Sequence, residues 1–423
     1  MDRKGLRLPI VAVMVVLALV AAACGDDVGS GEAGTDSEAN GDRIVLGHAA
    51  AYSGTEAYLG PAMLSGIELA ISEINEAGGV LDKELAIETT DTEGRPETAV
   101  SAISNLVDVE NVVALIGPTS LEVFSVIDSL QDSEIPTIVI GGSARLDDSV
   151  GGETMWRGIP SDTVMGPAMA KLATDEGLTT GVAVFEDQES AQSVKATVIS
   201  PYEALGGEFL AEIDPAVAQG NYRSEVLSML EGDPDVAFWQ MAPENASTFW
   251  QNAIEFPELE GLTVVGTDVL MAEESITAFG PALDRINVLA LSPTPEGAAK
   301  DDFIAAYNEF HDSEEPEVFS PNTYDATVLY SLAMIAGGSA DRQTIVDNMR
   351  DVAMAPGTVC SSFEECRDLL EDGEEINYEG AAGSWEFDEG GNVLGAFGIF
   401  EYQDGGMEQI GVLQEEDLEE ALE

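Results

Sequence analysis

The chain has 423 residues, of which 45% are hydrophobic, so it is long enough for two domains and is not disordered throughout. It carries 80 acidic against 16 basic side chains, and the formal net charge of −64 argues against binding to nucleic acid or to anionic lipid. Such a surface suits a protein in salty water, where ions screen the self-repulsion, and a saline habitat is therefore a hypothesis about its source.

The first 23 residues have the pattern of a signal peptide. Basic residues in positions 3–7 precede an apolar run that is too short for a comfortable membrane span, and three alanines precede Cys24. Small residues directly before a cysteine resemble a bacterial lipobox, in which the cysteine is lipidated and becomes the mature N-terminus; the alternative is a plain secretory signal. Residues 24–42 are polar and rich in glycine, so we expect a flexible tether.

From Ile44 onward, strand patterns alternate with helix patterns, which predicts a doubly wound parallel sheet. The predicted strands of this first part are Ile44–Leu46, Glu84–Thr89, Val112–Ile116 and Thr137–Ile140, and the predicted helices are Pro61–Ala77, Pro96–Val107 and Leu121–Leu130.

Polar residues follow two of these strands. Gly117 and Pro118 are expected to end the third strand, and Thr119 and Ser120 then offer hydroxyl groups or a helix N-cap. The fourth strand ends in Gly141-Gly142-Ser143. In open α/β sheets, ligands bind beyond the carboxyl ends of the strands, so the strand end at Gly117–Ser120 is a candidate for half of a binding site, the alternative being an ordinary strand–turn–helix connection.

The alternation restarts near residue 160 and predicts a second α/β unit of the same kind, whose last strand ends in Gly266-Thr267-Asp268. Three further helix patterns and a tail of short β segments follow. The predicted strands are Gly181–Phe185, Glu208–Ile213, Val236–Gln240, Thr263–Val265, Ser384–Phe387, Val393–Tyr402 and Gln409–Leu413, and the predicted helices are Val164–Glu176, Ala191–Leu205, Asn221–Leu230, Ala246–Glu255, Phe303–Phe310, Pro321–Ala336 and Arg342–Val352.

Cys360 and Cys366 are the two cysteines that remain besides Cys24. In an exported chain we favour a local disulfide over a metal site, because neither His48 nor His311 lies near them in sequence. The sequence has no Walker loop, no metal-ligand cluster and no complete nucleophile elbow, so we expect neither catalysis nor a cofactor.

Four stretches together resemble one known family. They are Ser65–Leu81 (SGIELAISEINEAGGVL), Ile116–Ser120 (IGPTS), Arg157–Asp162 (RGIPSD) and Tyr378–Gly383 (YEGAAG), the last followed by Phe387-Asp388. From Asp42 to about Gly411, the chain resembles the branched-chain amino acid type of solute-binding proteins of ABC transporters, and the ELA…EINEAGG run is the most specific match.

The resemblance implies two α/β lobes joined by three crossover segments, with a ligand in the cleft between the lobes. It places residues 43–159 and 292–380 in the first lobe, and residues 160–291 and 381–423 in the second. The crossovers fall near Gly158–Ser161, Ala290–Pro293 and Glu379–Ser384.

By the same resemblance, Thr119, Ser120, Gly142 and Ser143 stand where the family binds the carboxylate of an amino acid, and Asp268 stands where it binds the ammonium group. Hydroxyl and backbone N–H donors suit a carboxylate, and helix N-termini favour an anion. The alternative for Asp268 is a helix N-cap.

The aromatic walls typical of members that bind amino acids are altered. Tyr58 is displaced by one place, Ser190 and Met241 or Ala242 stand where family tyrosines fall, and Ala144 replaces a hydroxyl. These departures put leucine-like specificity in doubt. Other rings that could form walls, or equally pack in the core, are Tyr52, Trp156 and Trp239. The arginines Arg145 and Arg157 could pair with a ligand carboxylate, but ion pairs within the fold are the favoured interpretation.

These observations predict a monomeric extracytoplasmic lipoprotein without catalytic activity. It closes around a small amino-acid-like solute and presents it to the membrane subunits of an ABC permease. The alternative is a ligand-sensing receptor of the same fold that does not transport.

Overall fold

The computed structural model describes residues 43–54, 56–148, 150–151, 153–294, 298–313, 315–393, 395–403, 405–413 and 417. The expected signal peptide 1–23, the expected lipid-anchor Cys24 and the expected tether 24–42 lie outside these residues. Within the described ranges, no helix combines the length and the apolar character that a membrane crossing requires.

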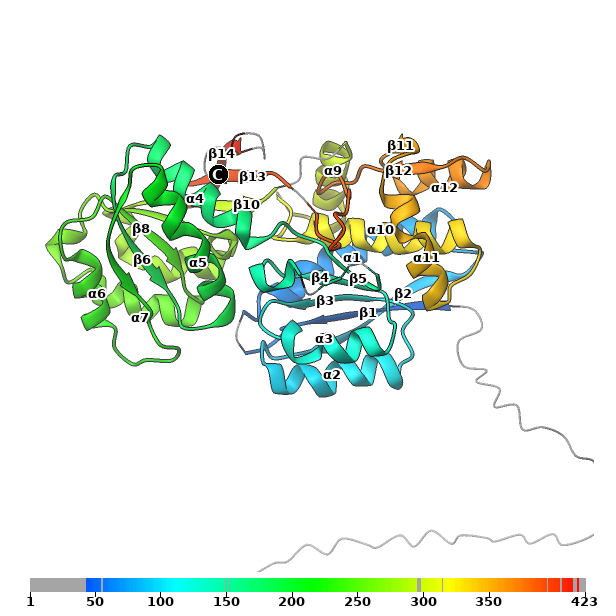
Figure 1. The fold of residues 1–423 in the computed structure, drawn as a ribbon, viewed down its shortest axis with the longest axis horizontal. Helices are drawn as coiled ribbons and strands as arrows, with labels where there is room; N and C mark the ends of the chain where they lie inside the picture. The colour runs from blue at the N-terminus through cyan, green and yellow to red at the C-terminus, as the bar shows by residue number, and fades with distance from the viewer. Residues whose placement is uncertain are drawn as a thin grey trace, which may run out of the picture. The chain divides into compact units, whose positions relative to one another are not determined.

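The first sheet has five parallel strands in the order β2-β1-β3-β4-β5, with helices on both faces. Its elements are β1 (Arg43–Ala50), α1 (Leu59–Glu76), β2 (Glu84–Asp91), α2 (Pro96–Asp108), β3 (Leu115–Thr119), α3 (Val123–Asp132), β4 (Thr137–Ile140), β5 (Met155–Arg157) and α10 (Ser320–Gly337). Successive side chains of a strand point to opposite faces. In β1, Ile44 and Leu46 therefore enter the core under α1 and α10, whereas Val45 and Ala49 enter the core over α2 and α3 (Figure 1).

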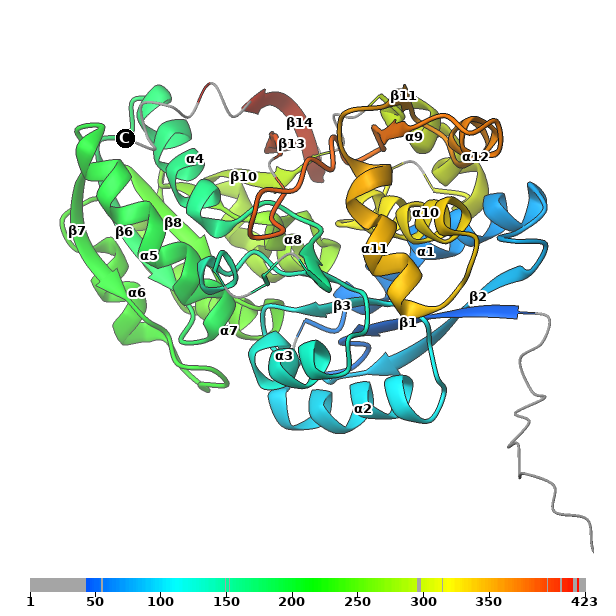
Figure 2. The same ribbon diagram turned by 45° about the vertical axis from the view of Figure 1, so that its right-hand side comes forward.

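The second sheet has seven strands in the order β14-β13-β10-β9-β8-β6-β7, of which β13 and β14 form an antiparallel edge. Its elements are α4 (Asp162–Asp175), β6 (Thr180–Phe185), α5 (Glu189–Ala204), β7 (Glu208–Ile213), α6 (Arg223–Leu230), β8 (Val236–Gln240), α7 (Pro243–Ala253), β9 (Thr263–Gly266), α8 (Glu273–Phe279), β10 (Asn287–Pro293), β13 (Phe397–Gln403) and β14 (Gly406–Leu413). Two cores again lie on opposite faces, with Val182 in one and Ala183 in the other. Figure 2 shows α4 and α5 over β6 and β8. The predicted α/β architecture of two doubly wound lobes is therefore confirmed, and we call these units the first and the second lobe.

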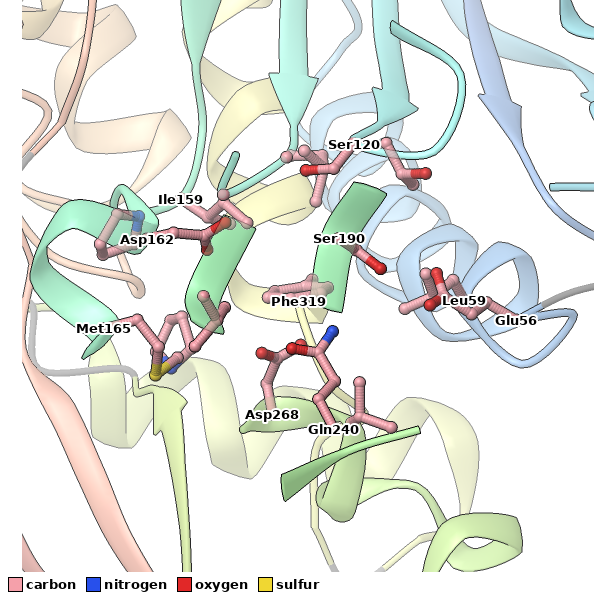
Figure 3. Close-up of a pocket in the computed structure, with 18 of the residues that line it drawn as sticks. Glu56, Leu59, Ser120, Ile159, Asp162, Met165, Ser190, Gln240, Asp268 and Phe319 are labelled. Atoms are coloured by element: carbon pink, nitrogen blue, oxygen red, sulfur yellow. The ribbon is translucent and has the colours of Figure 1, made fainter. Parts of the chain in front are cut away.

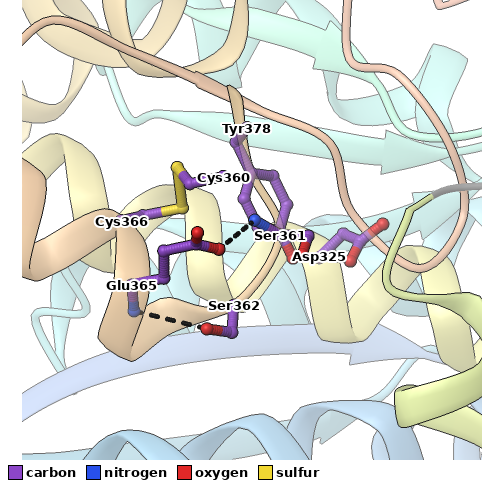
Figure 4. Close-up of a disulfide and its surroundings, with 7 residues drawn as sticks. All are labelled: Asp325, Cys360, Ser361, Ser362, Glu365, Cys366 and Tyr378. Carbon is purple, nitrogen blue, oxygen red and sulfur yellow. Dashed lines mark hydrogen bonds between the residues drawn. A yellow bond between two sulfur atoms is a disulfide. The ribbon is translucent and has the colours of Figure 1, made fainter. Parts of the chain in front are cut away.

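The remaining elements extend the first lobe. They are α9 (Lys300–His311), α11 (Arg342–Ala353), β11 (Thr358–Cys360), α12 (Phe363–Glu371) and β12 (Ile376–Tyr378). A disulfide joins Cys360 to Cys366 at the start of α12, with the two Cα atoms 5.4 Å apart. Ser362 caps this helix by accepting the N–H of Glu365, as Figure 4 shows.

The bounds of the buried strands β4 and β8 and of the edge strand β7 match the prediction, whereas β5, α8, β10, β11, α12 and β12 were not predicted as regular elements. The expectation that Gly117 and Pro118 end the third strand is wrong. Strand β3 begins at Leu115 and includes both residues, because a register shift between Ile116 and Thr119 accommodates the proline within the sheet.

The third crossover is held by Asp325, a fully buried residue of α10. Its carboxylate accepts hydrogen bonds from the Tyr378 hydroxyl (2.8 Å), from the backbone N–H groups of Ala381 (2.9 Å) and Ala382 (2.8 Å), and from the Trp385 indole (3.1 Å). Four donors on one carboxylate fix this segment against the first lobe.

The tail joins the second lobe later than expected. The side chains of Trp385, Phe387 and Val393 lie in the core of the first lobe, although the expected boundary was residue 381. The strand expected at Ser384–Phe387 is also absent from the described structure, in which Ser384 forms only an isolated bridge with Glu379. The apolar alternation there reflects packing against α10 and its neighbours, which sequence periodicity does not distinguish from a strand.

We expect Asp325→Ala to lower the free energy of unfolding by roughly 3 kcal/mol, because it leaves several buried donors without an acceptor. Urea denaturation measures this loss. The matched control is Asp284→Ala, which truncates an exposed aspartate and is expected to change stability by less than about 0.5 kcal/mol. A loss for Asp325→Ala as small as that of the control would contradict the anchoring role.

Candidate functional site

Loops from both lobes line one pocket beyond the carboxyl ends of their strands (Figure 3). Thr119 ends β3 and Gly142 follows β4, whereas Gln240 ends β8 and Asp268 follows β9. Parallel strands bring their carboxyl ends to the same edge of a sheet, so residues far apart in sequence meet there. The sequence-predicted residues Thr119, Ser120, Gly142, Asp268 and Tyr58 all line this pocket.

Ser143 and Met241 do not belong to the pocket lining. The Ser143 backbone N–H donates to the Ser120 hydroxyl oxygen (3.1 Å), which ties the two strand-end loops of the first lobe together. Met241 is 1% exposed and packs in a core of the second lobe. Because neighbouring side chains at a strand end point in opposite directions, the pocket receives Gln240 instead.

The hydrogen-bond donors of Thr119, which were expected to bind a ligand carboxylate, are already engaged within the protein. Its backbone N–H and its hydroxyl group both donate to the carboxylate of Glu122, at 3.1 and 2.5 Å, and Glu122 also accepts the hydroxyl of Thr92 at 2.5 Å. The sequence carried a signal for this contact, since Thr119-Ser-Leu-Glu122 has the spacing of a capping box. The donors that we expected to meet a ligand carboxylate are therefore engaged by a carboxylate of the protein.

Three carboxyl groups line the pocket, and two of them, Glu56 and Asp162, were not predicted. Burial raises the pKa of Glu56 to about 8, and the negative charges of Glu122 and Asp268 add to this shift. Burial also raises the pKa of Asp162 to about 7, against a hydrogen bond from Ser193. The pKa of Asp268 is about 7 for the same reason. No lysine, arginine or histidine is among the described residues that line the pocket.

The carboxylate of Asp162 lies directly against the backbone of Gly142. A Cβ atom added to Gly142 would lie 2.3 Å from the Asp162 Oδ1 atom, and the Asp162 N–H donates to the Gly142 carbonyl at 2.6 Å. A side chain at this position would therefore require the Asp162 carboxylate to move. Asp162 begins α4 of the second lobe, so this contact also joins the two lobes at the pocket.

The walls of the pocket are apolar and aromatic. Tyr58, Phe319 and Phe397 supply rings, and aliphatic side chains fill the spaces between the polar groups. Trp156 and Trp239 are instead buried in the cores of the two lobes. The rings that sequence reasoning missed, Phe319 and Phe397, come from segments more than 100 residues away from the strand-end loops of the first lobe.

Both arginines near the pocket are paired within the protein. Arg157 is fully buried and forms an ion pair with Asp147 at 2.9 Å, and Arg145 forms one with Glu189 at 3.0 Å. This agrees with the favoured interpretation of the sequence. No group of three or more histidine, cysteine, aspartate or glutamate residues in the described part of the chain is arranged to hold a metal ion.

Residues 43–363 match the sequence model of the family described as periplasmic binding protein. The substrate-binding protein BasB of a chemotactic signal transduction system in Halobacterium salinarum is 22% identical over 358 residues, which cover 82% of this chain and 84% of that protein. The Leu/Ile/Val-binding protein BraC3 of Rhizobium johnstonii is 24% identical over 339 residues, covering 75% and 86%.

Among solved structures, LivJ of Streptococcus pneumoniae, the substrate-binding protein of a branched-chain amino acid transporter, is similar in fold. Its complex with isoleucine superposes with a TM-score of 0.73 at 21% identity, covering 88% of this chain and 99% of that chain. At this level of identity the likeness shows that the two chains share a fold.

We expect Glu56→Gln to stabilise the protein by more at pH 8.5 than at pH 5.5. A carboxyl group whose pKa is raised to about 8 binds more protons in the folded than in the unfolded state, so it lowers stability as pH rises from about 4.5 to 8. In urea denaturation, the gain at pH 8.5 should exceed the gain at pH 5.5 by on the order of 3 kcal/mol.

Glu76→Gln is the matched control, because Glu76 is exposed on the neighbouring helix α1. It should change stability little at either pH. An effect of Glu56→Gln that is equal at pH 5.5 and pH 8.5 would show that the carboxyl group of Glu56 carries no burial penalty.

Proposed function

Because the chain belongs to the periplasmic binding protein family, we propose that it captures a small polar solute in the pocket described above and delivers it to the permease of an ABC transporter. The observation that carries the proposal is that both lobes line one pocket. Ser120 and Gly142 come from the first lobe, and Gln240 and Asp268 come from the second. A solute that contacts both lobes favours the closed arrangement over the open one, and such hinge closure is how two-lobed binding proteins hold a ligand.

The polar groups that the second lobe contributes to the pocket are best suited to bind an amine group of the solute. Asp268 has no basic partner among the described pocket residues, and the neighbouring Gln240 side chain adds another acceptor. The similar proteins LivJ and BraC3 are described as binding branched-chain amino acids, which also carry an ammonium group. The proposed solute is therefore an amino acid or a related amine.

A sensing role is the second candidate, because the similar protein BasB serves chemotactic signal transduction. Capture of the solute is the same step in both roles. Uptake of labelled solute by cells with and without the gene separates them, since a sensor without transport leaves uptake unchanged.

The proposal also includes a location outside the cytoplasm, as the family implies. The signal peptide 1–23, lipidation of Cys24 and a tether over residues 24–42 would hold the binding lobes at the membrane surface. A lipid chain anchors a protein by burying its methylene groups in the bilayer.

Asp268→Asn should weaken binding of the captured amine roughly 100-fold, because the amide cannot neutralise an ammonium group in a buried site. Isothermal titration calorimetry measures the affinity. Asp284→Asn is the control, since it removes an exposed carboxylate of the same lobe and should bind as the wild type does. Unchanged affinity in Asp268→Asn would exclude this aspartate from the site.

Cys24→Ser should move the protein from the membrane fraction to the soluble fraction, because a serine offers no thiol for lipidation. Fractionation and detergent phase partition of the expressed full-length chain measure this. If the variant stays in the membrane fraction to the same extent as the wild type, Cys24 is not the anchor.

A further inference from the structure

Several polar groups that line the pocket are hydrogen-bond acceptors, namely three carboxyl groups and the Gln240 amide oxygen, and they lie beside hydroxyl groups such as those of Ser120 and Ser190. Glu56 is 5% exposed, and its carboxyl group has no hydrogen-bond partner among the described residues. Gln240 is 6% exposed, and its Oε1 atom likewise lacks a partner within the described structure. Figure 3 shows the Gln240 amide beside the Asp268 carboxylate, with the Asp162 carboxylate across from them. A buried acceptor without a donor is costly, so these groups point to a ligand that brings donors.

The part of the first lobe that would hold a ligand carboxylate is occupied by carboxylates of the protein. The hydroxyl and N–H of Thr119 donate to Glu122, and the Asp162 carboxylate lies against Gly142. A carboxylate on the solute would therefore meet the like charges of Glu122 and Asp162 there, and the hydroxyl groups of Ser120 and Ser190 would be the side-chain donors left to it. A second ammonium group in that place would instead meet acceptors from Asp162.

The balance of charge leads to the same conclusion. Three carboxyl groups line the pocket, and no basic side chain is among the described residues of its lining; Arg157, whose charge lowers the pKa of Asp162, is paired with Asp147. A zwitterion brings one positive and one negative charge, so it leaves the net charge of the pocket unchanged. A dication offsets two of the three carboxylates, which removes most of the repulsion among them.

The carboxyl groups stand on separate elements around the pocket, which suits a ligand with separated charges. Glu56 precedes α1, Asp162 begins α4 and Asp268 follows β9, so each comes from a different element. The aliphatic side chains of Leu59 and Met165 also line the pocket, and they suit a methylene chain. The rings of the pocket wall also attract alkylammonium groups.

A neighbouring hollow carries the same sign of charge. It shares Tyr58 with the pocket and is lined by the carboxylates of Glu244, Glu273, Glu274 and Glu317, with His311 beside them. A surface on which one sign of charge predominates concentrates ligands of the opposite sign.

From these contacts we propose that the captured solute is a diamine or polyamine, an aliphatic chain with at least two protonated amine groups and no carboxylate. This inference depends on the proposed capture function and specifies its substrate class. Asp268 and Gln240 bind one amine group of the solute, and Asp162 binds a second. Glu56 lies on the α1 side of the pocket, and its negative charge contributes to the attraction of both amine groups.

Three compounds of similar length test the inference by isothermal titration calorimetry: 1,4-diaminobutane, butylamine, and 4-aminobutanoate. Butylamine lacks one of the two ammonium groups, and 4-aminobutanoate carries a carboxylate in its place. We expect the diamine to bind roughly 30-fold or more tighter than butylamine, and 4-aminobutanoate and leucine to bind more weakly still, because hydrogen bonds to charged groups are the strong ones. Diamines with three and five methylene groups and spermidine complete the series.

Proton release distinguishes a dication from a zwitterion independently of affinity. Glu56 faces Glu122, Glu186, Glu244 and Asp268, whereas Asp162 faces Asp147, Arg157 and Asp268. Burial raises the pKa values of these carboxyl groups, so at pH 7 Glu56 is mostly protonated and Asp162 and Asp268 are about half protonated. A bound dication that ionises all three should therefore displace about two protons, against about half a proton for a zwitterion held by Asp268 alone. Titration calorimetry in buffers of different ionisation enthalpy counts the protons, and diamine affinity should rise at least about tenfold from pH 6 to pH 8.5.

Asp162→Asn tests the position of the second amine group. It should weaken binding of the diamine roughly tenfold or more while leaving the affinity for butylamine nearly unchanged, because butylamine uses the Asp268 end. Asp284→Asn again serves as the control, and circular dichroism checks that each variant is folded.

The outcomes separate this inference from the proposed function. Leucine or 4-aminobutanoate binding more tightly than every diamine would overturn the inference and leave the capture function standing. If no amine, amino acid, amide or organic acid in a thermal-shift panel binds to the wild-type protein, both are rejected.

Discussion

The constraint on which this site depends is the burial of three carboxyl groups around one pocket without a basic partner among the described residues that line it. Taking a charged group out of water is costly unless an opposite charge or several donors compensate. Glu56, Asp162 and Asp268 come from separate loops, and the two sheets bring these loops together. In the free protein these carboxyl groups stay partly protonated, as their raised pKa values indicate, and this reduces the energetic cost of burying them. A bound cation can replace the protons.

Elsewhere in the fold, buried charges are compensated. Asp325 accepts four hydrogen bonds, Glu122 accepts three, and the buried Arg157 is paired with Asp147. The missing compensation is therefore a local property of the pocket and not a general consequence of an acidic sequence. Carboxyl groups with perturbed pKa values in a cleft are typical of functional sites, and here the contrast within one chain strengthens that inference.

The sequence predicted the parts of the site that follow buried strands. Apolar runs defined β4 and β8, the rule that ligands bind beyond strand ends pointed to Ser120, and the family resemblance added Gly142 and Asp268; all three line one pocket. Glu56 and Asp162 were missed because their burial is created by tertiary contacts, which leave no periodic pattern in the sequence. Phe319 and the late return of the tail were missed for the same reason, since both depend on which distant segment packs against the first lobe.

Like charges on the two lobes also couple binding to closure. Glu56 belongs to the first lobe and Asp268 to the second, and the negative charge of Asp268 is one of the causes of the raised pKa of Glu56. In the ionised protein, this repulsion disfavours the arrangement in which the two groups face each other. A cation between them removes the repulsion and adds attraction to both lobes, so its differential affinity for the closed arrangement is large. The charge of the ligand thereby decides both which solute is retained and whether the lobes close.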